Sequence, residues 1–424
     1  MGNIMTASVQ RRIKENFMTN SADLSLLTYT SLYPNTRQPR HGVFIEQRLR
    51  HLMAEFPVQG RVVAPVPWFP LRGQRYGLYG NYASVPQQET LASVPVWHPR
   101  YPVVPKLSWH VSPWLMYHAT RRLVAELHAA QRIDVIDAHF FYPDGVAAVM
   151  IGRELGIPVS ITARGSDLTL MPDFALPRRW ILWAAAKADA LITVCAALRD
   201  RLLELDVAGE RVTVLRNGVD LERFVPRAPE PVRERLQLHG RVLLSVGNLI
   251  ELKGHHLVIE ALRELPDCSL MIIGDGPERA ALERLAERLG VSARVRFLGL
   301  IPQAELSHYY AAADALVLAS SREGWANVLL EAMACGTPAV ATRVWGTPEV
   351  VAAPAAGVLI DERSAAGVAA GVRSLFATAP LRSATRAYAE SFSWSDTSRG
   401  QYELFARLKA ARQAETVSST QLGA

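Results

Sequence analysis

Two glutamates in the second half of the chain stand at a spacing that could hold one ligand from two sides. Glu323 and Glu331 have seven residues between them, in a segment that reads as a strand end, a loop and a short helix. A helix can start near Asn327, since Asn is a good N-cap, and Gly336-Thr-Pro338 supplies a stop. Glu323 then lies on the loop, and Glu331 lies one turn past Asn327 on the same helix face.

The chemistry of this segment favours a ligand that carries phosphates between two polyols. Unpaired backbone N–H groups at a helix start attract an anion such as a diphosphate. An ionised glutamate only accepts hydrogen bonds, and hydroxyl groups can donate them. Carboxylates on both sides of an anion site therefore predict a nucleotide sugar. The alternative for Glu331, a solvated residue on an amphipathic helix, is weakened by its apolar neighbours.

A lysine on a second loop could meet the same diphosphate. Val242 to Val246 reads as a strand, Lys253 lies on the loop that follows, and a helical pattern continues to Leu262. A lysine ammonium is a compact point charge that suits a phosphate. The loop is neither a Walker loop nor a complete dinucleotide fingerprint, and Gly274-Asp-Gly276 alone is a weak signal.

The elements that must position these residues form two series of short apolar runs, each run followed by a helical pattern. The runs span 24–29, 61–65, 135–138, 159–163, 190–194 and 212–215, then 242–246, 270–273, 295–298, 315–318, 339–341 and 358–360. Such alternation is typical of parallel sheets covered on both faces, and a Pro-rich linker at 226–231 separates the two series. We therefore predict an α/β chain with two Rossmann-like domains, which bind ligands beyond the carboxyl ends of their strands.

Composition narrows the functional classes. The 424 residues are 49% hydrophobic and too many for one ordinary core. The net charge of +6 comes from the first half, which suits anionic lipid or a phosphate-bearing substrate, and equally an ordinary solvated surface. No motif or basic block indicates nucleic-acid binding. The scattered Cys195, Cys268 and Cys335 favour neither a disulfide framework nor a zinc site.

Membrane contact is expected to be peripheral at most. No segment predicts a signal peptide or a membrane span, so we expect a cytoplasmic protein that could touch the inner membrane. Residues 65–114 contain nine prolines and nine aromatic residues and break the regular pattern. We expect a long loop region there, which either forms an acceptor-binding or membrane-touching lip or packs on its own side chains.

Taken together, the motifs resemble the retaining glycosyltransferases of family 4, whose fold is GT-B. The resemblance covers nearly all of residues 23–410 and rests on Lys253 and the Glu323 to Glu331 motif as a set. Three stretches of the first half are similar to bacterial enzymes of exopolysaccharide, colanic-acid or teichuronic-acid synthesis: Asp137-Ala-His139-Phe-Phe-Tyr-Pro-Asp-Gly145, Thr162-Ala-Arg-Gly-Ser-Asp167 and Arg216-Asn-Gly-Val-Asp220.

The resemblance implies a domain layout. It places an N-terminal acceptor-side domain over 23–218 and a nucleotide-sugar-binding domain over 219–388. Residues 1–22 are polar and charged, and this composition predicts a disordered tail before the first domain. The two Rossmann-like domains would face each other across a cleft. Return helices over 389–412 would cross back to the first domain and precede a second disordered tail over 413–424.

The resemblance also implies roles around the donor. Glu323 would hold hydroxyls of the donor sugar, Glu331 would hold the ribose, and Lys253 would neutralise the leaving group. The backbone amides that would meet the diphosphate belong to Gly324, Trp325, Ala326, Asn327 and Val328.

Other residues would act from the first domain or the cleft. His139 matches a histidine that faces the reacting sugar, and Gly42 lies where a glycine loop passes the donor phosphate. Arg164, Asp167 and Asn217 would line the acceptor side or the cleft.

One donor-binding position departs from the family. Asn248 stands where many relatives carry an arginine, and an Asn cannot contribute charge to the diphosphate. Arg164, Arg322 or Arg343 could compensate.

The implied reaction moves a sugar from a UDP- or GDP-linked donor to a hydroxyl of a saccharide or polyprenyl-linked acceptor, with retention. The sequence has no Asp-x-Asp motif, so we expect neither a metal nor another cofactor. Glu323 is expected to position the sugar rather than to attack it. The alternatives are a nucleotide-sugar epimerase of the same fold and a non-catalytic nucleotide-sugar-binding subunit. A scaffold has no need of Lys253, Glu323 and Glu331 together.

Overall fold

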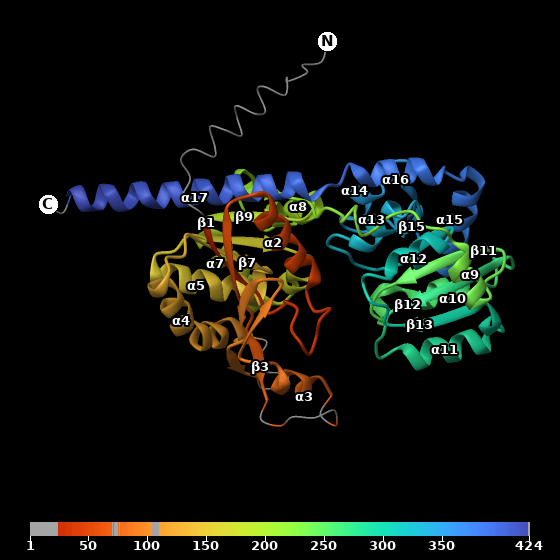
Figure 1. The fold of residues 1–424 in the computed structure, drawn as a ribbon, viewed down its shortest axis with the longest axis horizontal. Coiled ribbons are helices and arrows are strands. Elements are labelled where there is room, and N and C mark those ends of the chain that lie inside the picture. Colours follow the sequence, from red (N-terminus) through yellow and green to blue (C-terminus); the bar gives the residue numbers. More distant parts are fainter. Residues whose placement is uncertain (1–23, 70, 72–74, 76, 104–109, 423–424) are drawn as a thin grey trace, which may run out of the picture. The chain divides into compact units, whose positions relative to one another are not determined.

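The computed structural model describes residues 24–69, 71, 75, 77–103 and 110–422 (Figure 1). Close contacts group the chain into two compact units. Unit 1 comprises Met1–Ile161, Trp183–Ala190 and Ser398–Ala424, and unit 2 comprises Thr162–Leu182 and Leu191–Thr397. The domain limits expected at 218 and 388 stay predictions, and the tail expected over 1–22 lies outside the described residues.

The first sheet has eight strands in the order β10-β9-β8-β7-β1-β2-β5-β4. Their bounds are β1 Leu24–Tyr29, β2 Val58–Val63, β4 Gln88–Leu91, β5 Val94–Trp97, β7 Val135–His139, β8 Val159–Ala163, β9 Ala190–Thr193 and β10 Val212–Val214. Strand β1 pairs in parallel with β2 and β7, whereas β4 pairs antiparallel with β5. Strands β1, β7, β8 and β9 are buried along their whole length, which explains their continuous apolar runs.

The second sheet lies in unit 2 and is parallel throughout, in the order β13-β12-β11-β14-β15-β16. Its strands are β11 Arg241–Val246, β12 Cys268–Ile273, β13 Val295–Gly299, β14 Ala315–Leu318, β15 Ala339–Thr342 and β16 Gly357–Ile360. Buried side chains such as Leu270, Val317 and Val340 join the helices to this sheet in one core. The carboxyl ends of β11 and β14 lead into the two loops that carry Lys253 and Glu323.

Helices follow most of the strands. They are α2 Val43–Glu55, α3 Gly77–Ser84, α4 Ser112–Ala130, α5 Val146–Leu155, α6 Ser166–Thr169, α7 Ala175–Lys187, α8 Ala196–Glu204, α9 Glu230–Leu236, α10 His255–Ala261, α11 Arg279–Arg288, α12 Leu306–Ala312, α13 Asn327–Ala334, α14 Thr347–Val350, α15 Ala365–Thr378, α16 Arg382–Glu390 and α17 Trp394–Leu422. A π-helical segment spans Phe141–Gly145, and short 3-10 turns span Met171–Asp173, Gly209–Arg211, Glu251–Lys253 and Ser292–Arg294.

The described part of the segment 65–114 contains more regular structure than the long loop region expected from its prolines. It contains α3, adds β4 and β5 to the edge of the first sheet, and forms a two-stranded sheet from β3, Val66–Trp68, and β6, Arg100–Pro102. Along β5 the side chains of Val94 and Val96 are buried and alternate with partly exposed ones. Strand β5 lies between β2 and β4, and Pro95 stands opposite Thr90 of β4. A proline inside a short apolar run argues against a strand, which hid β5 from the sequence pattern.

The final helix, α17, continues to Leu422, although a disordered tail was expected from residue 413. An ion pair between Arg412 and Glu415, three residues apart, suits a helix in this segment. From Ser398 onward α17 belongs to unit 1, where Tyr402 stacks on Phe56 with ring centroids 4.6 Å apart.

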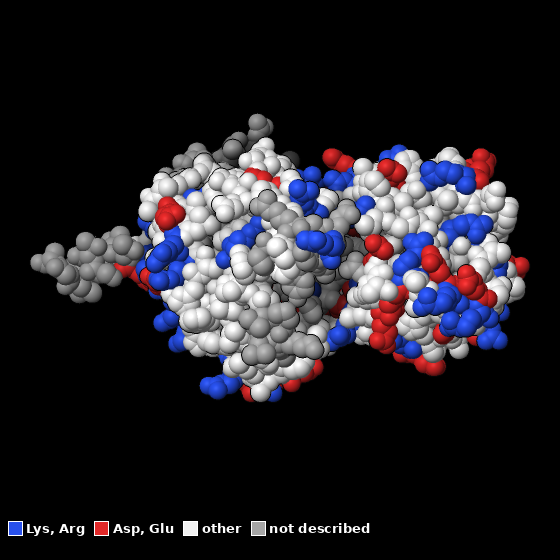
Figure 2. Space-filling model, turned by 90° about the horizontal axis from the view of Figure 1, so that it is seen from below, with Lys and Arg blue, Asp and Glu red and all other residues white. Residues whose placement is uncertain are grey.

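The described surface shows how charge is distributed over each unit. On the face shown in Figure 2, acidic and basic side chains are interspersed over unit 2, whereas much of the described surface of unit 1 is uncharged. Among the described helices, none is both long enough and apolar enough to cross a membrane.

Candidate functional site

The loop after β11 is held in shape by a buried histidine that the sequence analysis did not single out. The hydroxyl of Ser245 donates to His255 Nδ1 at 2.9 Å, and His255 Nε2 donates to the carbonyl oxygen of Asn248 at 3.2 Å. Burial lowers the pKa of His255 to about 4, so the imidazole is neutral at physiological pH. The loop is thereby fastened to β11 and α10, while the Asn248 residue stays exposed.

Lys253 ends this loop and forms an ion pair with Glu323. The Lys253 Nζ atom lies 2.6 Å from Glu323 Oε1, and the two side chains are only 23% and 10% exposed. At Gly254 the backbone is left-handed, and a Cβ there would lie 2.1 Å from the carbonyl oxygen of Ala319. This close approach brings the end of the lysine loop to the end of β14. Two residues expected to act on the same ligand therefore meet at one point.

Glycines allow three chain segments to cross beside Glu323. A Cβ on Gly324 would lie 1.8 Å from the carbonyl oxygen of Arg164 and 2.9 Å from the Cα of Gly165. A Cβ on Gly346 would lie 2.1 Å from the carbonyl oxygen of Gly324. These separations are far below van der Waals contact, so only glycine fits at 324 and 346. The loop that follows β8, the Glu323 loop and the loop that follows β15 are thus held together through their backbones.

Helix α13 begins at Asn327, but the expectation that Asn327 caps it was wrong. Ala326 occupies the N-cap position, and no side chain caps the helix there. The Asn327 Oδ1 atom instead accepts a hydrogen bond from Asn217 Nδ2 at 3.1 Å, and Asn217 Oδ1 accepts from Arg164 Nη1 at 3.0 Å. The hydrogen bond from Asn217 occupies Asn327 Oδ1, the atom that would otherwise accept from a backbone amide of the first turn of α13. It also brings three of the predicted site residues together.

Several donors gather just before α13. The Asn327 amide donates to the carbonyl oxygen of Trp325 at 3.1 Å, whereas in the described structure no hydrogen bond is found for the amides of Gly324, Trp325 or Ala326. The Trp325 side chain is 7% exposed, and its Nε1 has no acceptor among the described residues. A buried indole N–H normally finds a partner. The segment 324–326 can therefore supply several hydrogen bonds to an anion or a polyol.

Glu331 lies on α13 and receives a hydrogen bond from a buried tyrosine. The Tyr310 hydroxyl donates to Glu331 Oε2 at 2.7 Å. Burial raises the pKa of Glu331, while the Tyr310 bond and the charge of Arg223 act in the opposite direction. Tyr310 was not predicted, because it lies on α12, and nothing in its local sequence points to α13.

Asp167 was expected on the acceptor side or in the cleft, and the structure shows it stabilising a turn. Its Oδ1 accepts from the amide of Gly165 at 2.8 Å and from the amide of Arg164 at 3.2 Å. The residue is 1% exposed. Its carboxylate thus shapes the backbone that crosses Gly324.

A second glutamate that sequence reasoning missed stabilises the same region. Glu349 Oε1 accepts from the amides of Ala196 and Ala197, at 2.7 and 3.2 Å, at the start of α8. Its Oε2 pairs with Arg216 Nη2 at 2.6 Å. The available signal was its place in Gly346-Thr-Pro-Glu349, just after the carboxyl end of β15.

Two predicted residues belong to unit 1. His139 ends β7, is 1% exposed, and its Nε2 lies 3.1 Å from Asp137 Oδ2. Gly42 immediately precedes α2 with a φ of 68°, and a Cβ there would lie 2.2 Å from the carbonyl oxygen of Leu32. The backbone at Gly42 therefore requires glycine, and the imidazole of His139 is oriented by Asp137.

Two further residues proposed from the sequence, Arg343 and Val328, show no hydrogen bond to the residues described above. Arg343 pairs with Asp361 on the surface, so compensation for Asn248 by an arginine stays a prediction. Val328 is partly exposed in the first turn of α13. Among the described residues, no group of three or more histidines, cysteines or acidic residues has the arrangement of a metal site.

Comparison with known proteins assigns the chain to a family. The sequence model described as Glycosyltransferase Family 4 matches residues 48–223, and the one described as Glycosyl transferases group 1 matches residues 228–392. A D-inositol 3-phosphate glycosyltransferase of Frankia alni is 34% identical over 320 residues, which cover 68% of this chain and 77% of that protein. The chain belongs to glycosyltransferase family 4. The resemblance inferred from the motifs is thereby confirmed.

Other relatives of this family 4 glycosyltransferase agree with the assignment. A glycosyltransferase named for teichuronic acid biosynthesis, TuaC of Bacillus subtilis, is 29% identical over 332 residues, which cover 76% of this chain and 82% of that protein.

Solved structures establish the fold of this family 4 glycosyltransferase. Sucrose-phosphate synthase from Thermosynechococcus elongatus superposes with a TM-score of 0.72 at 19% identity and covers 92% of this chain and 100% of its own. HepE of Anabaena in complex with UDP superposes with a TM-score of 0.69 at 20% identity and covers 91% of this chain and 100% of its own. The predicted GT-B fold with two Rossmann-like sheets is confirmed.

Proposed function

We propose that this family 4 enzyme transfers a sugar from a nucleoside diphosphate sugar to a hydroxyl of a saccharide or lipid-linked acceptor, with retention and without a metal, in the synthesis of a cell-surface polysaccharide. The observation that carries this proposal is the contact between Lys253 and Glu323 at 2.6 Å, next to the amides before α13. A cation suits the diphosphate, and a carboxylate suits the sugar hydroxyls. Because the two side chains are in contact, they could bind a donor on either side of the bond between its sugar and its diphosphate.

The known proteins support the donor class. HepE structures are described as complexes with UDP, with UDP and glucose, and with UDP-glucose. The teichuronic acid biosynthesis relative supports a role in polysaccharide synthesis. We extend both to this chain as part of the proposal.

Charge neutralisation drives the proposed reaction. As the bond between the anomeric carbon and the diphosphate breaks, negative charge grows on the leaving oxygen. Lys253 and the preorganised amides of Gly324 to Ala326 would stabilise that charge without reorganisation. Glu323 would hold the sugar while its charge is balanced by Lys253, a role that fits a positioning group better than a nucleophile. Glu331, held by Tyr310, would accept hydroxyls of the ribose.

A donor screen tests the proposal. UDP-sugars and GDP-sugars are added to the protein, and thermal unfolding is followed, because a ligand that binds only the folded state raises the melting temperature. The donor that binds is then incubated with saccharide and polyprenyl-linked acceptors, with and without EDTA, and the anomeric configuration of the product is read by NMR. Epimerisation of the donor without an acceptor would favour the epimerase, and binding without turnover would favour the non-catalytic subunit.

We further propose cytoplasmic synthesis, with peripheral contact to the inner membrane. Trp68 and Trp114 of unit 1 are 54% and 51% exposed, and tryptophan is typical of membrane interfaces. Flotation with anionic vesicles should weaken in a Trp68→Ala/Trp114→Ala variant and not in Leu381→Ala, which changes a side chain 74% exposed in unit 2. Equal flotation of all three proteins would rule out this contact.

A further inference from the structure

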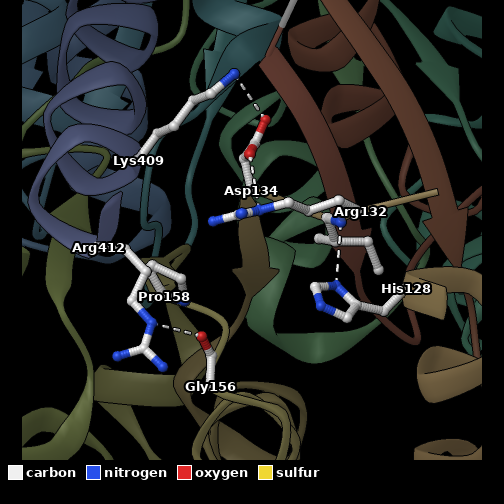
Figure 3. Close-up of a pocket in the computed structure, with 8 residues that line it drawn as sticks. His128, Arg132, Asp134, Gly156, Pro158, Lys409 and Arg412 are labelled. Atoms are coloured by element: carbon white, nitrogen blue, oxygen red, sulfur yellow. Dashed lines mark hydrogen bonds and ion pairs between the residues drawn. The ribbon is translucent and has the colours of Figure 1, made fainter. Parts of the chain in front are cut away.

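A pocket of about 240 Å³ lies in unit 1, at the amino ends of β7 and β8 (Figure 3). It is lined by the end of α4, the turn between α5 and β8, and α17; the residues that matter are His128, Arg132, Asp134, Gly156, Lys409 and Arg412. Ligands of Rossmann-like sheets bind at the carboxyl ends of the strands. His139 marks that end of β7, so this pocket lies at the opposite edge of the sheet.

The lining is positively charged. Arg132, Lys409 and Arg412 supply three basic side chains, and Asp134 is the one carboxylate among the described residues that line the pocket. Asp134 is itself fastened to the sheet, because its Oδ2 accepts from the amide of Ser25 at 3.0 Å. The same oxygen lies 3.0 Å from Lys409 Nζ, and Arg132 Nε lies 3.7 Å from Asp134 Oδ1. The carboxylate therefore holds two cations at the pocket and leaves the lining with an excess of positive charge.

Arg412 is held at the pocket by the turn between α5 and β8. Its Nε donates to the carbonyl oxygen of Gly156 at 2.9 Å. Gly156 has a φ of 67°, and a Cβ there would lie 2.5 Å from Arg412 Nη2. Glycine at this turn thus serves two purposes: it adopts the left-handed conformation that ends α5, and it leaves room for the guanidinium.

His128 adds a neutral donor. Its Nδ1 accepts from the amide of Ile133 at 3.1 Å, so the neutral ring carries its proton on Nε2. Burial lowers the pKa of His128, and the charges of Arg132 and Arg61 lower it further. The imidazole thus senses the positive potential of the pocket.

We propose that this pocket binds a phosphate group, and that the bound phosphate fastens α17 to the amino edge of the first sheet. Arginine and lysine from two elements converge on a volume that can hold a phosphate, and guanidinium groups match phosphate oxygens in geometry. A second pocket of about 250 Å³ shares Gly156, Pro158 and Arg412. It is also lined by the basic Arg153 and Lys187 and by the carboxylates Asp189 and Glu415, so it adds volume beside the phosphate site but no excess of positive charge. This site is separate from the proposed donor site and does not rest on that function.

Proton NMR of the histidine rings tests the site locally. The His128 signal is assigned by its loss in His128→Gln, and its titration is followed with and without inorganic phosphate and pyrophosphate. An anion in the pocket should raise the pKa of His128, and Arg132→Ala should weaken the effect about tenfold in phosphate concentration. Arg132 is 59% exposed, so its removal should leave the fold intact.

Arg241→Ala is the matched control. Arg241 is 55% exposed and lies 3.9 Å from Asp314, a geometry close to that of Arg132 and Asp134, but in unit 2. It should leave the response of His128 unchanged. Equal weakening by both variants would mean general screening of charge and would overturn the proposal.

A second arm distinguishes a free phosphate from a lipid headgroup. Flotation with phosphatidylglycerol vesicles is compared with phosphatidylcholine vesicles for the wild-type chain, Arg132→Ala and Arg241→Ala. A His128 response to soluble phosphate identifies the free anion, and vesicle binding that only Arg132→Ala weakens identifies the headgroup. If neither readout depends on Arg132, the pocket does not recognise phosphate.

Discussion

The Lys253 ammonium lies 2.6 Å from the carboxylate of Glu323, although the two residues come from loops that follow different strands, β11 and β14. Gly254 makes this contact possible because its backbone passes the carbonyl oxygen of Ala319 closely. The pair joins the cation expected at the diphosphate to the carboxylate expected at the sugar. The pair therefore belongs to the proposed donor site.

Tyr310→Phe should weaken donor binding. The change removes the hydroxyl that donates to Glu331 and keeps the ring that packs edge-on against Phe224. A hydrogen bond to a charged group contributes about 1.5 to 3 kcal/mol, so we expect about a tenfold or greater loss of affinity, measured by calorimetry with the donor that the screen identifies. Tyr309→Phe is the control, because that hydroxyl accepts from Arg235 and does not contact Glu331. An equal loss in both variants would contradict a positioning role for Tyr310.

Donor affinity should begin to fall at a higher pH than the titration of a solvent-exposed glutamate would cause. Burial raises the pKa of Glu331 above its usual 4.5, and the proposed contact with the ribose needs the ionised carboxylate. Affinity should therefore fall as the pH decreases towards 4.5, and this decrease should be absent in Glu331→Gln. Tyr310→Phe should move it to higher pH. A pH profile that is the same in the wild-type chain and Glu331→Gln would exclude Glu331 as the titrating group.

The free energy of unfolding should also depend on the protonation of Glu331, but it should rise on acidification, whereas donor affinity should fall. A pKa raised in the folded state means that the folded chain binds the proton more tightly than the unfolded chain. The stabilisation is complete below the unfolded pKa and is lost as the pH rises through the folded pKa. Donor binding and intrinsic stability thus favour different protonation states of Glu331.

Gly324→Ala should destabilise unit 2. Its methyl group would lie 1.8 Å from the carbonyl oxygen of Arg164, and backbone cannot move aside as a flexible side chain can. Forced overpacking costs about 1 to 3 kcal/mol and sometimes more, which urea unfolding can measure. Gly299→Ala is the control, because a Cβ there meets nothing within 4 Å and tests only the cost of a left-handed backbone, about 1 to 2 kcal/mol. A stability of Gly324→Ala equal to that of the wild-type chain would contradict the crossing.

The sequence predicted much of the fold because buried parallel strands leave local marks. The expected runs 24–29, 159–163 and 315–318 coincide with β1, β8 and β14, and each is buried along its length. Strand β2 begins at Val58, three residues before the expected run at 61. The prediction missed this start because Gln59 and Gly60 interrupt the apolar pattern. Such an interruption hides a strand that tertiary packing nevertheless stabilises.

The candidate site was predictable only in part, for a physical reason. Lys253 and Glu323 follow strand ends, where ligand contacts concentrate, and could be named from the sequence. Tyr310 and Glu349 act through contacts with residues 21 and 153 positions away, and His255 acts through Ser245 on the preceding strand. No local periodicity encodes such pairs. The oxygen of Asn327 illustrates the limit, since a long-range bond to Asn217 replaced the helix cap that its local sequence favoured.

Removal of the Lys253 charge tests the account most directly. Turnover of the identified donor is measured for the wild-type chain, Lys253→Ala and Arg373→Ala; the last removes a surface ion pair with Glu264 in the same unit. Loss of one preorganised donor to the leaving group should lower turnover by about a hundredfold to a thousandfold in Lys253→Ala, with Arg373→Ala unchanged. Turnover of Lys253→Ala equal to that of the wild-type chain would contradict the central claim that this lysine neutralises the departing diphosphate.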